Sequence, residues 1–175
     1  MQKSRSTAVD RSPSAGTPQD AIALLKADHR EVEKLFAQFE KTRFAMRKEK
    51  LADEICNALR VHTTIEEEIF YPAFFEATEE EDLHNEAQVE HDGAKYLIQK
   101  IEGSGPDDEL FDAQVKVLSE MIKHHVNEEE KRDGMFAKAR QSDMDLEEIG
   151  QQLQARKAEL QGKKRPQLVD KLSRA

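Results

Sequence analysis

The stretch VHTTIEEEIFYP, residues 61–72, decides the fold that we expect of this chain. His62 and Glu66 within it are four residues apart, so on a helix both side chains project from one face, one turn from each other. An imidazole and a carboxylate placed in this way can share a metal ion. The stretch closes with Pro72, which limits the continuation of a helix. We therefore interpret it as the end of a helix that carries two candidate metal ligands.

A second copy of the pattern occurs at residues 125–129, HVNEE, where a histidine and a glutamate are again four residues apart. Spacing alone does not establish a site, because a histidine and a glutamate at this distance usually form a solvated pair on a helix surface. Two further pairs have the same spacing, His29/Glu33 and His124/Glu128. The distribution of the histidines over the whole chain has to decide between these interpretations.

The composition favours helices. Charged residues make up 36% of the 175 residues and hydrophobic ones 37%, with no Trp and only seven Gly and five Pro. No apolar run approaches the roughly 18 residues of a membrane span, and no apolar segment follows the first residues as in a signal peptide. The single cysteine, Cys56, excludes an internal disulfide framework and fits a reducing compartment. We expect a cytoplasmic protein with no membrane association.

Charge divides the chain into a central part and two ends. The net charge is −9, yet residues 1–18 and 150–175 are both net positive, so the acidic excess lies between them. An acidic domain repels nucleic acid, and we expect no nucleic-acid partner. Residues 1–17, rich in Ser, Thr, Gly and Pro, are predicted to be a disordered tail. Residues 18–140 are predicted to form the domain, followed by a C-terminal helix and basic tail at 141–175.

Start and stop signals predict four main helices and a shorter fifth. The first is expected to begin at Thr17, with Pro18 in its first turn. The second is expected over about residues 46–71, and Thr78 offers an N-cap for the third. The Gly-Ser-Gly-Pro sequence at 103–106 should end the third helix and start the fourth. Residues 142–145 cap the fifth, which we expect to pack across the others.

Each of the four main helices has one stripe that mixes apolar residues with a histidine. The stripes are Ile22, Leu25, His29, Val32, Phe36 and Phe39; Leu51, Ile55, Ala58 or Leu59, His62, Glu66 and Ile69; Ala87, His91, Ala94, Ile98 and Ile101; and Phe111, Leu118, Met121 or Ile122, His125, Glu129 and Phe136. Four helices with short connections predict an all-α, up-down-up-down four-helix bundle with an additional C-terminal helix. Counted from the shared end of such a bundle, the four stripe histidines reach roughly one level.

That common level favours a metal site over a polar core without metal. A buried carboxylate without a partner is costly, and two of them in an apolar bundle call for compensating positive charge. Imidazole and carboxylate donors suit iron, zinc or manganese. Six candidate ligands exceed the four of a closed zinc site and suit two octahedral ions. They are His29, His62, Glu66, His91, His125 and Glu129.

The remaining candidates are expected to lie outside the centre. His84 lies two turns before His91 and is expected at the surface. His124 should point away from the centre, and Glu128 is a plausible substitute for Glu129. Glu67, Glu68 and Glu130 are expected to be solvated or to contact the ligands from outside. Ferritin-like di-iron bundles use paired Glu-x-x-His motifs, and this chain has only Glu81/His84, at another level.

The full arrangement His29 … His62-x-x-x-Glu66 … His91 … His125-x-x-x-Glu129 resembles the hemerythrin-like family, the HHE cation-binding domain. The resemblance covers roughly residues 18–140 and includes the local sequences LLKADH at 24–29 and VEHD at 89–92. It implies a four-helix bundle with two non-haem iron ions (Fe2+/Fe3+), bridged by Glu66 and Glu129, with the histidines as terminal ligands. It also implies a small diatomic molecule or peroxide as the exogenous ligand.

The chain departs from that pattern at Lys95. Oxygen-carrying members of the family have a second histidine four residues after the ligand of the third helix, and here that position is Lys95. The loss of one imidazole would leave a further iron position open, which favours a centre that reacts or senses over one that carries oxygen.

Three functions remain open from the sequence. The first is a di-iron protein that binds or senses oxygen, nitric oxide or redox state. The second is a di-iron enzyme acting on peroxide, or an iron-handling or repair protein. The third is a structural helical module without metal. No set of catalytic residues or cofactor-binding residues other than the metal ligands stands out, and whether the chain is an enzyme stays open.

Overall fold

The computed structural model describes residues 20–162, which are helical apart from short connections. The elements in chain order are α1 (Ala21–Lys41), α2 (Ala45–Ile65), the π-helix η1 (Glu66–Phe70), α3 (Tyr71–Thr78), α4 (Glu81–Glu102), α5 (Phe111–Glu130), α6 (Met135–Gln141) and α7 (Leu146–Gly162). None of the helices in this part of the chain is long and apolar enough to cross a membrane.

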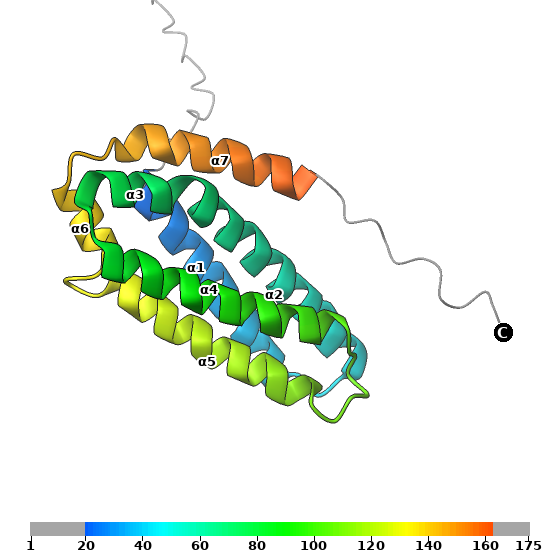
Figure 1. The fold of residues 1–175 in the computed structure, drawn as a ribbon. Helices are drawn as coiled ribbons and strands as arrows, with labels where there is room; N and C mark the ends of the chain where they lie inside the picture. Colours follow the sequence, from blue (N-terminus) through cyan, green and yellow to red (C-terminus); the bar gives the residue numbers. More distant parts are fainter. Residues whose placement is uncertain (1–19, 163–175) are drawn as a thin grey trace, which may run out of the picture.

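Helices α1, α2, α4 and α5 form the four-helix bundle (Figure 1). The pairs α1–α2 and α4–α5 make the most extensive contacts, and α2–α4 and α1–α5 contacts close the bundle. The α1–α2 and α4–α5 connections lie at one end, and α3 and α6 lie at the other (Figure 1). Helix α7 packs on α1, α2 and η1, as expected for a helix that crosses the bundle. The predicted all-α bundle with an additional C-terminal helix is therefore confirmed.

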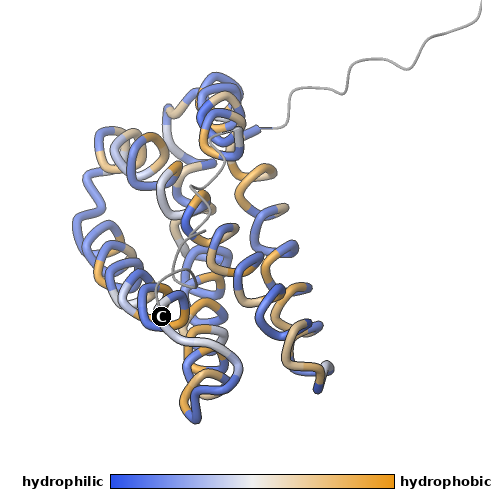
Figure 2. Tube along the Cα trace, turned by 90° about the vertical axis from the view of Figure 1, so that its right-hand side faces the viewer, coloured by the Kyte–Doolittle hydropathy of each residue, from blue (hydrophilic) through white to orange (hydrophobic). Residues whose placement is uncertain are grey.

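Two apolar clusters fill the interior. Hydrophobic and hydrophilic residues alternate along the helices, as expected for helices with one buried side (Figure 2). The first cluster, on the side of the α1–α2 connection, includes Val32, Leu59 and Ile122. The second, beneath α3, α6 and α7, includes Leu25 and Ile65. His29 lies between Leu25 and Val32 along the chain, and His62 lies between Leu59 and Ile65, so the candidate site is a polar layer between the two apolar clusters. Apolar packing on both sides fixes the helices that carry this layer.

The first helix begins later than predicted. Asp20 is its N-cap, and Asp20 Oδ1 accepts a hydrogen bond of 2.8 Å from the Ala23 amide. The predicted cap, Thr17, and Pro18 lie outside the described residues. The prediction of a disordered tail at residues 1–17 also falls there, and the domain boundaries stay predictions.

The second helix does not stop at Pro72, and that prediction was wrong. The chain passes through η1 and continues as α3 to Thr78, with Pro72 in the first turn of α3. The Tyr71 amide donates to the Glu66 carbonyl, five residues back. A proline is tolerated at the start of a helical segment, and the wider π turn marks the place where the ladder of hydrogen bonds changes. The extra residue in this turn leaves Ile69 half-buried and turns Tyr71 into the interior.

Thr78 is not the N-cap of the third bundle helix. It is the last residue of α3, and its hydroxyl donates a 2.7 Å hydrogen bond to the Phe74 carbonyl. Glu79 then adopts the left-handed conformation (φ 54°), and α4 begins at Glu81. The break at residues 103–106 is confirmed, although α5 begins only at Phe111.

Phe136 does not share a helix with His125, because the chain turns at residues 131–134 and Phe136 belongs to α6. Gly134 makes this turn possible. A Cβ at Gly134 would lie 2.3 Å from the Glu128 carbonyl oxygen and 2.8 Å from that of Glu129. Both atoms belong to the backbone of the last turn of α5, so they cannot move without shifting the Glu129 side chain.

A Gly134→Ala variant is therefore expected to lose about 1–3 kcal/mol of unfolding free energy, the usual cost of overpacking, and part of its metal affinity. Chemical denaturation and metal content measure the two effects. Gly105→Ala is the matched control, because a Cβ there meets no atom within 4 Å, and its unfolding free energy should change by less than about 0.5 kcal/mol. A Gly134→Ala variant as stable as the control would contradict this account of the turn.

Candidate metal centre

The six candidate ligands predicted from the sequence lie together in the buried layer. One histidine comes from each of α1, α2, α4 and α5, Glu66 opens η1, and Glu129 lies in the last turn of α5. The exposed fraction is 0% for Glu66 and 2% for Glu129, and each histidine is at most 6% exposed. The prediction that they reach one level is therefore confirmed, whereas their role as ligands remains a proposal.

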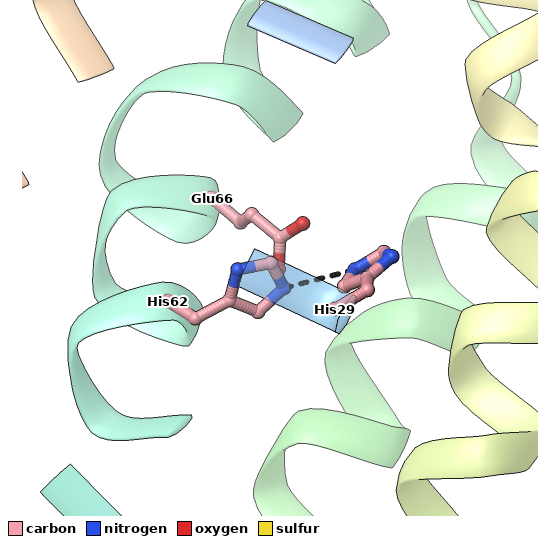
Figure 3. A group of neighbouring side chains, drawn as sticks. All are labelled: His29, His62 and Glu66. Carbon is pink, nitrogen blue, oxygen red and sulfur yellow. Dashed lines mark hydrogen bonds and ion pairs between the residues drawn. The ribbon is translucent and has the colours of Figure 1, made fainter. Parts of the chain in front are cut away.

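The four imidazoles form two pairs that face each other through Nε2. The Nε2 atoms of His29 and His62 lie 3.1 Å apart (Figure 3), and those of His91 and His125 lie 3.3 Å apart. Two imidazole nitrogens at right angles around an ion, each about 2.1 Å from it, are about 3 Å apart. Each pair thus has the separation of two neighbouring ligands of one metal ion.

Each carboxylate joins the two pairs. Glu66 Oε2 lies 3.1 Å from His62 Nε2 and 3.4 Å from His91 Nε2. Glu129 Oε2 lies 3.4 Å from His29 Nε2 and 3.6 Å from His125 Nε2. A single carboxylate therefore contacts one histidine of each pair, which is the placement that a bridge between two ions requires.

Hydrogen bonds among the six side chains do not satisfy all of their polar atoms, and two metal ions would satisfy the carboxylate oxygens that are left. Glu66 Oε1 is buried and makes no hydrogen bond within residues 20–162. Two ligand sets with atoms within 4.8 Å of one another share Glu66, namely His29/His62/Glu66 and Glu66/His91/His125. A buried carboxylate oxygen without a hydrogen bond is costly, and a cation bound between the histidines would compensate it.

Carboxylates also surround the outer nitrogens of the histidines. His29 Nδ1 donates to Glu130 at 2.7 Å, His91 Nδ1 to Glu67 at 2.9 Å and His125 Nδ1 to Glu90 at 2.7 Å, while His62 Nδ1 lies 3.6 Å from Asp28. An acceptor at Nδ1 fixes the ring and leaves Nε2 free to bind a metal. Glu67 and Glu130 were predicted to be either solvated or in contact with the ligands from outside, and both contact a histidine. No pattern in the sequence singles out Asp28 or Glu90.

Lys95 points away from the centre. Its ammonium pairs with Glu67 at 2.6 Å and with Asp92 at 3.5 Å, and Glu67 in turn accepts from His91 Nδ1. Lys95 therefore pairs with an outer carboxylate and contacts none of the six candidate ligands in the described structure. Lys157 of α7 pairs with Asp28 in the same way, beside His62.

Tyr71 is a member of the site that the sequence reasoning missed. Its hydroxyl lies 3.1 Å from His91 Nε2, donates to Glu129 Oε1 at 3.0 Å and lies 3.5 Å from Glu66 Oε2. The missed signal is the proline one residue later, because the π turn beside it is what brings Tyr71 onto the Glu66 face. The pair His91/His125 thus has a hydroxyl group beside it, which the pair His29/His62 lacks among the described residues.

Without a metal ion, the buried carboxylates of the site raise the pKa values of its histidines. Burial opposes charge on His29, but the carboxylates of Glu129 and Glu130 outweigh it and raise its pKa to about 10. Burial likewise opposes charge on His91, and Glu66 and Glu67 raise its pKa to about 9. Burial acts against the ionised form of Glu129 as well, yet His125 and His29 lower its pKa to about 2. The buried carboxylates therefore favour positive charge at the histidines, and without a metal ion protons supply that charge.

Metal binding should therefore release protons. At pH 7.5 His29 and His91 are charged, and each must lose its Nε2 proton to bind an ion, so the affinity should rise with pH up to the raised pKa values and level off above them. The expected slope is up to about tenfold per pH unit for each of these imidazoles. Calorimetric titration with Zn2+ in buffers of different ionisation enthalpy counts the protons. Binding without proton release would contradict the positive charge on His29 and His91.

The other predicted non-ligands contact none of the four layer histidines. His84 was predicted at the surface, but it is half-buried against the rings of Tyr71 and Phe75. His124 is exposed and pairs with Glu90. Glu128 pairs with Lys131 rather than with a histidine of the layer, which leaves Glu129 as the α5 carboxylate of the centre.

Comparisons with known proteins agree with this geometry. Residues 20–139 match the family model of the hemerythrin HHE cation binding domain. A crystal structure of a hemerythrin HHE cation binding domain-containing protein from Mycobacterium kansasii superposes with a TM-score of 0.69 at 25% identity, covering 82% of this chain and 88% of that one.

A curated relative with a different description also matches part of the chain. It is a DNA nickase from Nostoc sp., 24% identical over 110 residues. The match covers 61% of this chain but only 30% of the relative's length. Most of that relative has no counterpart here.

Proposed function

The chain belongs to the hemerythrin HHE cation-binding domain family, and on this premise we propose that it holds two non-haem iron ions in the buried layer and binds or senses oxygen, nitric oxide or redox state. The proposed ligands are His29, His62, Glu66, His91, His125 and Glu129. One ion would lie at the pair His29/His62 and the other at His91/His125, with both carboxylates between them. A cytoplasmic location stays part of this proposal.

The observation that carries the proposal is the placement of each carboxylate between the two histidine pairs. Glu66 Oε2 and Glu129 Oε2 each contact one histidine of each pair at 3.1–3.6 Å. A closed structural zinc site needs four ligands around one ion, and here the six donors divide into two groups that share two members. Nitrogen and oxygen donors in this ratio suit iron.

Unequal surroundings of the two pairs support a reactive centre. Tyr71 lies beside His91/His125, and no comparable group lies beside His29/His62 among the described residues. A cavity of about 240 Å³ between α1, α2 and α7 reaches His62 and Asp28. A small molecule entering through this cavity would meet the pair His29/His62, on the side without the Tyr71 hydroxyl.

Iron, when bound, would supply an open coordination position and a change of one electron per ion. The chain supplies the surroundings. Tyr71 is fully buried, and burial together with Glu129 and Glu66 raises its pKa well above the usual value, so it keeps its proton and donates a hydrogen bond inside the centre. Carriage of oxygen requires only binding and release, whereas a buried hydroxyl donor fits a centre that reacts.

Anaerobic titration of the iron-loaded protein with nitric oxide, oxygen and peroxide, followed by absorption spectroscopy, tests this function. Spectral change that saturates and reverses would support binding or sensing. Repeated consumption of peroxide at an unchanged spectrum would support the alternative, a di-iron enzyme or iron-handling protein. A spectrum unaffected by all three ligands would contradict the proposal. Tyr71→Phe, which removes only the hydroxyl, should alter the spectral response, and Tyr96→Phe on the exposed face of α4 should not.

A further inference from the structure

A second group of metal-ligand side chains lies on the outer face of α4 and α5. It consists of Glu86 and Glu90 from α4 and His124 from α5. Glu86 and Glu90 are four residues apart, so both carboxylates project from one face of α4 and reach towards the neighbouring helix. His124 neighbours His125 on α5 but points away from the buried centre, towards these two carboxylates.

The geometry of this group suits a single ion. One donor atom from each of the three residues lies within 4.8 Å of the other two. His124 Nε2 is 3.2 Å from Glu90 Oε1, close to the separation of about 3 Å expected for neighbouring ligands of one ion. The His124 side chain is 61% exposed, so solvent can supply the remaining ligands.

Glu90 connects this group to the buried centre. Its Oε1 faces His124, while its Oε2 accepts a 2.7 Å hydrogen bond from His125 Nδ1. Glu86 and Glu90 also line a small cleft whose other lining residues include His125 and Glu129. Glu129 Oε2 faces His29 and His125 in the buried centre, so it is no part of this surface group. The hydrogen bond from His125 fixes the Glu90 side chain, so that its other carboxylate oxygen is held towards His124 at the surface.

We propose that Glu86, Glu90 and His124 form a third metal site, at the surface, for a divalent first-row transition-metal cation. One imidazole with two carboxylates selects this class over calcium and magnesium, which take oxygen ligands. Glu90 of this site also accepts a hydrogen bond from His125 of the buried centre, but none of the six ligands proposed for that centre belongs to the site. It therefore does not depend on which metal the centre holds.

The competing explanation is an ordinary ion pair between His124 and Glu90. Such a pair accounts for the 3.2 Å contact but not for Glu86, which lies within 4.8 Å of both partners. Glu128 also lines this cleft and pairs with Lys131. The Lys131 ammonium is therefore already paired with a carboxylate outside the group. An ion pair and a chelate differ in one measurable respect, since only the chelate retains a metal ion.

Equilibrium dialysis of the protein with its resident metal in place against Co2+ tests the proposal. Cobalt and resident metal are counted in the same samples. We expect one Co2+ per chain in addition to an unchanged resident content. His124→Ala and Glu86→Gln should lose this cobalt and keep the resident metal. His84→Ala and Glu109→Gln, an imidazole and an exposed carboxylate away from the group, are the matched controls and should retain it.

Cobalt that enters only in exchange for the resident metal would overturn the proposal, as would cobalt retention in both His124→Ala and Glu86→Gln. These outcomes are distinct from a failure of the di-iron function. A protein without iron at its centre would show that failure in the resident-metal count, before any cobalt is added.

Discussion

A Glu129→Ala variant is expected to bind less than half the metal of the unsubstituted protein. Glu129 Oε2 contacts a histidine of each pair, so its loss removes a donor from both ions. It also leaves His29 and His125 without the buried negative charge that balances a cation beside them. Metal content per chain after purification and dialysis measures the effect, and circular dichroism reports whether the helices remain.

The adjacent carboxylate provides the control for this variant. Glu128 is one residue away on α5 and pairs with Lys131, so Glu128→Ala should keep the full metal content. If Glu128→Ala loses metal and Glu129→Ala keeps it, the two residues have been assigned the wrong way round. His62→Ala tests the other pair. Full metal content in folded His62→Ala and Glu129→Ala proteins together would contradict the proposed ligand set.

A Leu118→Ala variant is expected to lose about 2–5 kcal/mol of unfolding free energy while keeping its metal. Leu118 is 0% exposed in the first apolar cluster. It lies seven residues before His125, about 10 Å along α5, so its truncation creates a cavity outside the polar layer. Denaturation by urea measures the unfolding free energy, and the metal content of the folded fraction measures the site.

Val117→Ala is the matched control for this substitution. Val117 is the neighbouring residue and is 45% exposed, so its truncation should change the unfolding free energy by less than about 0.5 kcal/mol. Equal losses in the two variants would show that the first cluster does not stabilise the bundle as described. Loss of metal in folded Leu118→Ala would show that the layer depends on packing two turns away.

The sequence predicts the helical stripes and the level of the histidines because both follow from the period of the helix. His29, His62, His91 and His125 each sit in an apolar stripe, and short connections fix the order and direction of the helices. Local signals near the ends of helices were less informative. Pro72 suggested the end of a helix, but the chain continues past it through the π turn of η1 into α3. Phe136 was expected on the same helix as His125, but the turn at residues 131–134 places it on α6.

Contacts between helices could not be predicted in the same way. Glu90 accepts from His125 and Glu130 accepts from His29, in each case across the interface between two helices. Such partners depend on the rotation of one helix against another, which spacing along a single helix does not determine. Tyr71 was missed for a related reason, since its position beside Glu129 follows from the extra residue in η1.

Metal content per chain, in protein purified from iron-supplemented cells, tests the central claim most directly. The account predicts about two iron ions per chain, since two histidine pairs share two carboxylates. One zinc ion per chain that iron cannot replace would contradict it and indicate a structural site. A folded protein that binds no metal would also contradict it and leave a structural helical module as the function.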